Sequence, residues 1–326
     1  MSASMNGRAL TDIHCHLAVL PTSSNGCLVS RRILKSTVAR LIAWQQGLPL
    51  DEPELANRLY LERLSDELQR SEHVSRAVLL AMDGVYDDSG RLDERLTDLM
   101  IRNDVVLDEA ARSGGRFLAG VSINPRRRDA IEELERCAQR GARLVKFLPN
   151  AQVFDPALDA FRPFYRRMAE LGLPLLSHIG YESTLAGHDQ SMGNPERLIP
   201  ALEEGATVIA AHGCSSGRFL FERHLAAMTR MLLAYPRFFT DAAALTLPTR
   251  VGGLLKLRSI PEVRGRLVYG TDYPLPCFSL PAVAGLSWGG FRRACAARTR
   301  FDRQYRVLEA LGLTPIDFES LRMARG

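Results

Sequence analysis

The sequence contains no long hydrophobic run. No segment reaches the roughly 18 uncharged apolar residues that a membrane-spanning helix needs. Residues Met1–Leu10 lack the apolar core of a secretory leader. We therefore expect no membrane association and a cytoplasmic location.

Cysteine pairs and concentrated positive charge are also missing. The 6 cysteines are scattered and none forms a C-x-x-C pair, which argues against a zinc knuckle or a disulfide framework. The 42 basic and 37 acidic residues give a net charge of +5, but they are spread along the chain rather than gathered in a basic arm. Nucleic-acid binding is therefore not expected. The ordinary globular composition, with 46% hydrophobic and 24% charged residues, excludes a disordered or low-complexity chain.

Short apolar runs alternate regularly with amphipathic stretches. Such alternation is typical of parallel β/α units. One amphipathic stretch is Asp129–Arg140, where apolar residues recur at the spacing of one helix face. The candidate strands are Thr11–Leu17, Arg76–Met82, Phe117–Ile123, Leu144–Leu148, Pro174–His178, Thr207–His212, Phe238–Ala243 and Leu267–Thr271.

Eight such units without a change in composition predict one α/β domain over residues 1–326, a (β/α)₈ TIM barrel, rather than two domains. Residues 18–75 are too many for a simple connection. Arg31–Gln46 and Glu52–Arg70 both have helical patterns. We therefore expect a helical insert after the first strand that lies over the barrel mouth.

The first predicted strand carries two histidines in Thr-Asp-Ile-His-Cys-His-Leu. Because side chains alternate along a strand, Asp12, His14 and His16 are expected on one face. Ile13 and Cys15 are expected on the other. This pattern alone fits either a metal site or a hydrogen-bonded pair of core histidines.

Three further polar residues come at the ends of predicted strands. His178 ends Pro-Leu-Leu-Ser-His, His212 ends Thr-Val-Ile-Ala-Ala-His, and Asp272 follows Leu-Val-Tyr-Gly-Thr. In a barrel the carboxyl ends of all strands meet at one mouth. Buried imidazole and carboxylate groups are costly there unless they share a partner such as a divalent cation. The sequence therefore predicts a metal site that these residues form with His14 and His16.

This arrangement resembles the amidohydrolase superfamily of metal-dependent (β/α)₈ enzymes. His14-Cys15-His16 is similar to its first-strand H-x-H, and His178, His212 and Asp272 are similar to the ligands of its fifth, sixth and eighth strands. Gly-Thr-Asp-Tyr-Pro resembles the branch that contains aminocarboxymuconate semialdehyde decarboxylase, related nonoxidative decarboxylases and lactonases. The resemblance implies a metal enzyme, commonly a homodimer, with a small-molecule substrate.

The resemblance and general chemistry together assign roles. His14, His16 and His178 are expected to hold a divalent ion, Zn²⁺ being the best match, which would lower the pKa of bound water towards about 7. Asp272 is expected to be a further ligand that accepts the proton of that water and passes it to the leaving group. His212 would either bind a second ion or polarise a substrate oxygen.

Lys146, in Leu-Val-Lys-Phe-Leu-Pro, has apolar neighbours and is expected to point into the barrel. In binuclear members of the resembled superfamily, the fourth-strand lysine is carboxylated and bridges two ions, which requires a neutral amine. The alternative is an ammonium group that pairs with Asp272 or with a substrate carboxylate. The sequence leaves both alternatives open.

Other residues are weaker candidates for the site. Glu182 and Tyr181 follow the fifth strand and could touch the substrate, whereas Asn124 could donate to a substrate oxygen or form a turn. Arg126–Arg128 are interpreted as a solvated loop, or as a contact for an anionic substrate. Cys214 is interpreted as a small buried thiol.

We considered three functional classes. The first is a hydrolase that cleaves an amide, lactone or ester bond through metal-activated hydroxide. The alternative is a metal-dependent nonoxidative decarboxylase or hydratase of a small carboxylic acid. A carbamate on Lys146 would favour hydrolysis, and a single ion with His212 free leaves decarboxylation open. A barrel that has lost catalysis is disfavoured because Asp272 and His212 are both intact.

Overall fold

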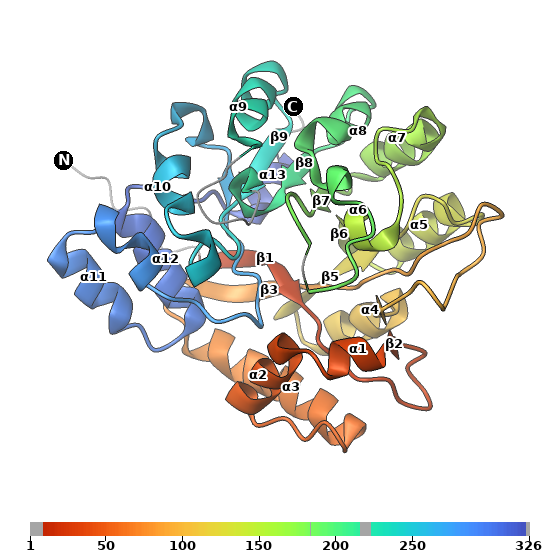
Figure 1. The fold of residues 1–326 in the computed structure, drawn as a ribbon, viewed down its shortest axis with the longest axis horizontal. Helices are drawn as coiled ribbons and strands as arrows, with labels where there is room; N and C mark the ends of the chain where they lie inside the picture. The colour runs from red at the N-terminus through yellow and green to blue at the C-terminus, as the bar shows by residue number, and fades with distance from the viewer. Residues whose placement is uncertain (1–8, 183, 216–222, 324–326) are drawn as a thin grey trace.

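The computed structural model describes residues 9–182, 184–215 and 223–323, and its centre is a barrel of parallel strands (Figure 1). The strands pair in the order β1-β3-β5-β6-β7-β8-β9-β10. Each of them overlaps one of the predicted runs, so the TIM-barrel prediction is confirmed. The strands are β1 (Leu10–His16), β3 (Val74–Leu80), β5 (Phe117–Ser122), β6 (Ala142–Phe147), β7 (Leu175–Ser177), β8 (Val208–Ala210), β9 (Phe238–Asp241) and β10 (Leu267–Val268).

Backbone hydrogen bonds between β1 and the segment that follows β10 close the barrel. The Ile13 N–H donates to the Tyr269 carbonyl at 3.0 Å, and the His16 N–H donates to the Tyr273 carbonyl at 2.8 Å. Cys15 and Tyr273 form a parallel bridge. Closure gives the first and last strands of the barrel a neighbour on each side, so that neither is an open edge of this sheet.

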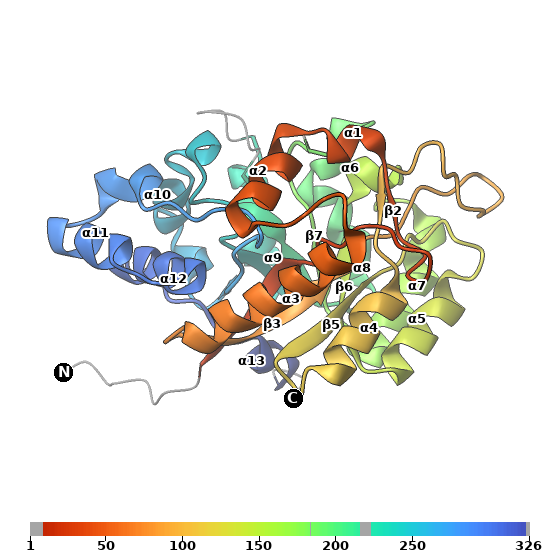
Figure 2. The same cartoon turned by 90° about the horizontal axis from the view of Figure 1, so that it is seen from below.

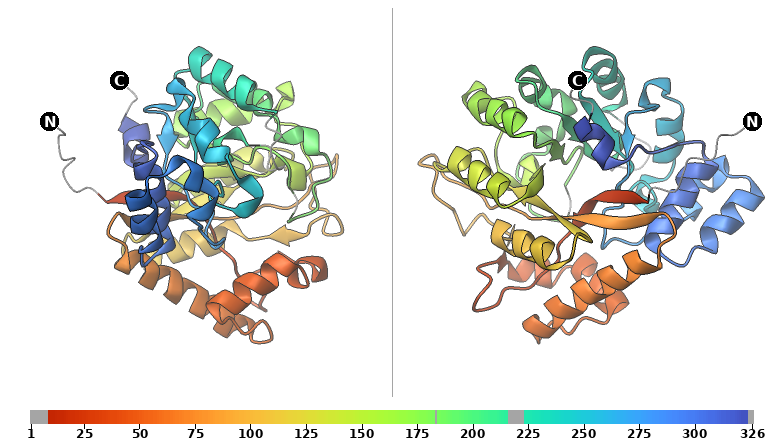
Figure 3. Two further views of the ribbon diagram at one scale, coloured as in Figure 1. Left: turned by 60° about the vertical axis from the view of Figure 1, so that its left-hand side comes forward. Right: turned by 180° about the vertical axis from the view of Figure 1, so that it is seen from behind.

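Helices cover the outside of the barrel, as the two further views in Figure 3 make clear. Among the described residues, no helix is long and apolar enough to cross a membrane. The helices that follow the strands are α3 (Pro53–Arg70), α4 (Asn103–Arg112), α5 (Ala130–Gln139), α7 (Arg162–Leu171), α8 (Ile199–Glu203), α9 (Leu225–Ala234), α10 (Gly253–Arg258) and α12 (Arg300–Ala310), and α11 (Trp288–Cys295) packs on α12.

Three helices lie between β1 and β3. Helix α3 packs on the barrel through buried residues that include Tyr60 and Leu64. Helices α1 (Arg31–Leu34) and α2 (Thr37–Gln46) begin at serine N-caps. In Figure 2 both lie on the same side as α6 (Pro149–Gln152), which follows the carboxyl end of β6, and opposite α13 (Phe318–Met323). Both helical stretches predicted after the first strand are therefore present, 31–46 on the side of the barrel mouth and 53–70 on the outer wall of the barrel. A short antiparallel pair, β2 (Leu28–Val29) with β4 (Leu99–Met100), adjoins them.

The strands separate two apolar clusters. Val145 and Phe147 belong to the outer cluster under the helices, whereas Leu144 belongs to the inner one. Phe318 of α13 is fully buried in the inner cluster, at the amino-terminal end of the barrel. The inner cluster consists of Ile13, Val78, Leu80, Leu144, Leu176, Ile209, Ala211, Phe239, Val268, Phe318 and Leu321.

The predicted alternation in β1 is wrong in one respect. Ile13 packs in the inner cluster and Cys15 in the outer one, so they do not share a face. The register of β1 against β3 shifts between Asp12 and Cys15, and such a bulge re-aims the side chains on either side of it. Asp12 consequently accepts hydrogen bonds from the backbone N–H groups of His14 at 2.8 Å and of Thr271 at 3.2 Å.

Candidate active site

The structure brings His14, His16 and Asp272 together at the carboxyl ends of β1 and β10. The Asp272 Oδ1 atom lies 3.4 Å from His14 Nε2 and 3.2 Å from His16 Nε2. The three donor atoms lie within 4.8 Å of one another, which is close enough to share one ion. His14 is buried, whereas the His16 side chain is 30% exposed, so solvent reaches the group from the His16 side.

His178 and His212 form a second group. His178 Nδ1 lies 3.1 Å from His212 Nε2, and the other ring nitrogen of His212 donates to the Ala243 carbonyl at 3.0 Å. The His178 Nε2 atom is buried and has no hydrogen-bond partner among the described residues. The ring centroids of His14 and His212 are 5.1 Å apart, so the two groups are adjacent.

Lys146 lies beside the first group. It is fully buried, as the prediction that it points inward requires, and its Nζ atom lies 3.1 Å from His14 Nε2, within hydrogen-bond distance. Burial lowers the pKa of Lys146 to about 8, although Asp272 and Asp241 act in the opposite direction. A substantial fraction of the side chain is therefore a neutral amine near pH 8.

Three histidines and Asp272 are in the protonation states that bind metals. Burial lowers the pKa of His14, His178 and His212, so these imidazoles are neutral. Burial would raise the pKa of Asp272, but its contacts with His14 and the hydrogen bond with His16 outweigh it and hold the pKa well below its ordinary value. The site thus combines neutral imidazoles with an ionised carboxylate.

Asp241 is a site residue that the sequence analysis missed. It ends β9, is fully buried, and accepts the Nδ1–H of His14 at 2.8 Å and the backbone N–H of His212 at 2.7 Å. The sequence pattern that could have identified it is Phe-Phe-Thr-Asp, in which a carboxylate ends an apolar run. His178 ends another apolar run in the same way.

Glu182 also lies near the histidines, although it belongs to a loop rather than a strand. Its Oε2 atom is 4.0 Å from His178 Nε2, and its Oε1 atom accepts the Leu185 N–H at 2.9 Å. Burial raises its pKa. Tyr181 is only partly buried, and Cys214 is a buried thiol, as expected.

The arginine run and Asn124 have partners within the chain. Arg127 donates to Asp129 at 2.8 Å, and Arg126 pairs with Asp88. The Asn124 amide donates to the carbonyls of Gly84 at 3.0 Å and Gln152 at 2.8 Å. These contacts favour the structural interpretations of Asn124, Arg126 and Arg127.

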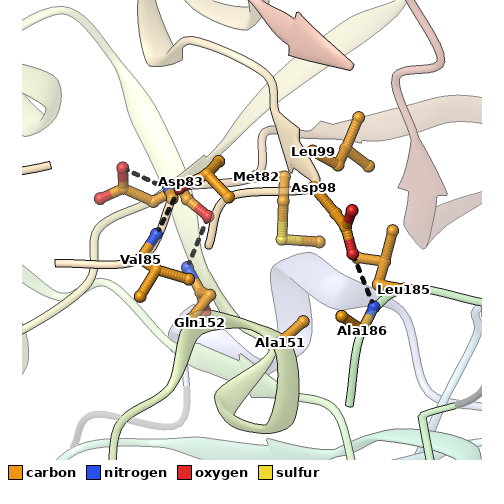
Figure 4. A pocket seen from close by; sticks show the side chains of 11 residues that line it. Met82, Asp83, Val85, Asp98, Leu99, Ala151, Gln152, Leu185 and Ala186 are labelled. Atoms are coloured by element: carbon orange, nitrogen blue, oxygen red, sulfur yellow. Dashed lines mark hydrogen bonds between the residues drawn. The ribbon is translucent and has the colours of Figure 1, made fainter. Parts of the chain in front are cut away.

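A narrow pocket lies next to the loop that carries Glu182 (Figure 4). Met82, Leu99 and Leu185 are among its lining residues. The Asp98 carboxylate on its wall accepts the Ala186 N–H at 3.0 Å and the Ser30 hydroxyl at 2.8 Å. Asp98 thereby joins the β7–α8 loop to the start of α1.

The sequence matches the amidohydrolase family over residues 11–294. The chain belongs to this family. It is an amidohydrolase-type enzyme, and its donor groups are those expected of a generally metal-dependent family. No curated protein matches the chain.

Solved structures share the fold of this amidohydrolase at low sequence identity. A TIM-barrel protein from Bordetella bronchiseptica has a TM-score of 0.61 and 16% identity, over 98% of this chain and 100% of its own. A proposed 2-pyrone-4,6-dicarboxylic acid hydrolase from Pseudomonas putida has a TM-score of 0.54 and 17% identity, over 97% and 93%. The 5-carboxyvanillate decarboxylase of Sphingomonas paucimobilis has a TM-score of 0.51 and 14% identity, over 94% and 99%. Similar barrels thus carry both hydrolase and decarboxylase names.

Proposed function

We propose that this amidohydrolase hydrolyses an amide, lactone or ester bond of a small molecule with the help of one or two divalent ions. The observation that carries the proposal is the convergence of two histidine groups beside a buried lysine whose pKa is about 8. Perturbed titratable groups gathered at a barrel mouth are typical of a catalytic site.

The donor set fits a divalent ion. His14, His16 and Asp272 would hold one ion, and His178 Nδ1 with His212 Nε2 would hold another. A bound ion supplies Lewis acidity and lowers the pKa of water. The two nitrogens of the second pair lie 3.1 Å apart. His212 Nε2 presents a lone pair, and His178 Nδ1 would present one once its proton moves to Nε2.

Two residues of the chain are assigned chemical roles. Asp272 is ionised and lies beside the half-exposed His16, where it can accept a proton from water and transfer it to the leaving group. Lys146, as a neutral amine, can attack CO₂; a nitrogen–carbon bond forms, a proton leaves, and the resulting carbamate is an anion able to bridge two ions.

The alternative activity is nonoxidative decarboxylation or hydration of a small carboxylic acid. It would use the same residues with one ion and His212 free. In the structure both ring nitrogens of His212 have hydrogen-bond partners, an arrangement that fits either activity. Zinc as the ion, an anionic substrate, a homodimer, a single domain over 1–326 and a cytoplasmic location stay predictions.

A substrate panel distinguishes these reactions. The zinc-loaded protein is offered esters, lactones and amides, with acid release as the readout, and small unsaturated or aromatic carboxylic acids, with CO₂ release or hydration as the readout. We expect turnover in the first group only, absent from His14→Ala. Turnover confined to the carboxylic acids would overturn the hydrolase proposal in favour of the alternative.

The role of Lys146 has its own test. Lys146→Ala should lower bound metal from about two ions towards one or none, because a bridging ligand is lost. Small carboxylic acids should partly restore metal and activity, because their oxygens can occupy the vacated space. If the variant keeps its full metal content and only raises KM for an anionic substrate, Lys146 is an ammonium that binds a carboxylate.

A further inference from the structure

Asp241 connects histidines that come from different strands. Its Oδ2 atom accepts the Nδ1–H of His14 at 2.8 Å, and its Oδ1 atom accepts the backbone N–H groups of His212 at 2.7 Å and of Ala243 at 3.0 Å. One buried carboxylate thus receives N–H groups from the end of β1, from the turn after β8 and from the segment after β9.

The contact with Asp241 determines which nitrogen of His14 carries the proton. With the Oδ2 atom of this carboxylate as the acceptor, Nδ1 carries the proton and Nε2 presents a lone pair. Two groups lie on the opposite side of the ring: Lys146 Nζ, 3.1 Å from Nε2, can donate to it, and the Asp272 Oδ1 atom is 3.4 Å away. The shorter contact, 2.8 Å to Asp241, favours the tautomer whose Nε2 can bind a cation.

The same carboxylate supports the backbone of His212. This residue has a φ of 63°, in the left-handed region that residues other than glycine seldom adopt. The bond from its N–H to Asp241 holds the turn. The ring then donates Nδ1–H to the Ala243 carbonyl and directs Nε2 at His178.

Gly270 leaves room for the contact between His14 and Asp241. A Cβ atom at position 270 would lie 2.9 Å from the His14 Cβ and 3.3 Å from Asp241 Oδ2. Any side chain there would have to push these two residues aside. The glycine therefore belongs to the same arrangement as the carboxylate.

We propose that Asp241 is a positioning residue that fixes the tautomer of His14 and the orientation of His212, so that both Nε2 atoms face the interior of the site. The inference rests on the proposed metal-dependent function. The donor atoms of His14, His212 and Asp241 are close enough to suggest a metal group of their own. However, both oxygens of Asp241 already accept N–H groups, and a cation would have to displace the His14 proton.

The test replaces the carboxylate by an amide. In Asp241→Asn the side-chain NH₂ can face His14 only if His14 changes tautomer, which places a proton on the nitrogen that should bind the ion. Loss of such a supporting partner typically weakens metal binding about 10- to 100-fold.

Two measurements are made. Zinc affinity is measured by competition with a chromophoric chelator. The tautomer is read from long-range ¹⁵N–¹H spectra of the metal-free, ¹⁵N-histidine-labelled protein, in which the His14→Gln variant identifies the His14 signals.

Asp302→Asn is the matched control. Asp302 is also a buried carboxylate, and it accepts the Ser71 hydroxyl at 2.7 Å and the His73 backbone N–H at 3.1 Å. It has no contact with the site histidines among its hydrogen bonds in the described residues. We expect its zinc affinity and the His14 tautomer to match those of the wild type.

We expect a protonated Nδ1 on His14 in the wild type, and in Asp241→Asn the other tautomer together with weakened zinc binding. The inference is overturned if wild-type His14 is protonated at Nε2, or if Asp241→Asn keeps the wild-type tautomer and affinity. It is also overturned if the variant loses one equivalent of zinc without a change of tautomer, because Asp241 would then be a ligand.

If Asp241→Asn does not fold, two other measurements test the inference. One is the spectrum of the wild type, and the other is the zinc affinity of Gly270→Ala, which we expect to be weakened in the same way. A wild type that binds no zinc contradicts the proposed function, while its spectrum still tests the tautomer.

Discussion

The lower half of the barrel interior lies towards the amino ends of the strands, and the upper half lies towards their carboxyl ends. The same strands build both halves, but the lower half is apolar and the upper half is polar. Leu176 and Phe239 pack in the inner apolar cluster, and the residues two positions later, His178 and Asp241, are the polar groups of the site. Leu144 and Lys146 repeat the pattern in β6. Two successive inward-facing positions on one strand therefore have different roles. The first stabilises the barrel, and the second, two residues later, belongs to the site.

This difference leads to a general expectation. Substitutions in the lower half should change the free energy of unfolding and leave metal binding intact. Substitutions in the upper half should change metal binding most, because the polar groups there are arranged for the ion rather than for packing. The predictions below test this division.

The largest effect is expected for His14→Ala. His14 contacts Asp272, Lys146 and Asp241, so its removal takes away both a donor and the centre of the first group. We expect nearly complete loss of bound metal and of activity, measured by elemental analysis and by turnover. His178→Ala should likewise empty the site. Retention of full metal content and activity in both variants would show that these histidines are not ligands.

Asp272→Asn should separate metal binding from catalysis. An amide oxygen ligates weakly, but it cannot accept a proton at neutral pH. We expect much of the metal and the fold to remain, while kcat falls by about 10²- to 10⁴-fold. Wild-type turnover of an identified substrate by this variant would rule out the proton-transfer role.

In the lower half, Leu176→Ala should lower the free energy of unfolding of the metal-free protein by about 2–5 kcal/mol, because it leaves a cavity in the inner cluster. Leu176 is fully buried there, two residues before His178. The number of ions bound per chain should not change. Urea unfolding and elemental analysis on the same sample check both statements, and a loss of metal with unchanged stability would contradict the division.

The smallest effect concerns the pH dependence of stability. Burial lowers the pKa of Lys146 from 10.5 to about 8 in the folded, metal-free protein. Between these values the unfolded chain binds a proton that the folded chain has released, so the free energy of unfolding rises with pH. Lys146→Met lacks this contribution.

We therefore expect the stability of the wild type relative to Lys146→Met to increase as the pH rises from about 8 towards 10.5. Urea unfolding at several pH values measures it. Lys35→Met, at an exposed position, serves as the control and should show no such trend. A difference between wild type and Lys146→Met that is constant with pH would mean that the lysine keeps an ordinary pKa in the folded chain.

The sequence predicts the barrel and most of the site because both depend on local patterns. Apolar runs locate every barrel strand, and polar residues at their ends locate His178, His212 and Asp272. The inward direction of Lys146 follows from the alternation in a regular strand. These features require no knowledge of distant contacts.

The remaining features depend on contacts that local patterns do not reveal. The bulge in β1 places Ile13 in the inner cluster, against simple alternation. Arg127 is held by Asp129, close in sequence, and by Asp83, far from it. Asp241 could have been identified by its position, but its contact with His14 joins residues 227 positions apart. Such pairings are decided by the closed barrel, not by either segment alone.

The most direct test of the metal site is anomalous X-ray diffraction from crystals of the zinc-loaded protein, with data collected on both sides of the zinc absorption edge. The account predicts an anomalous peak bounded by His14 Nε2, His16 Nε2 and Asp272, and a second one between His178 Nδ1 and His212 Nε2. Peaks confined to surface histidines such as His188, with these five side chains hydrogen-bonded to one another as in the metal-free structure, would contradict it.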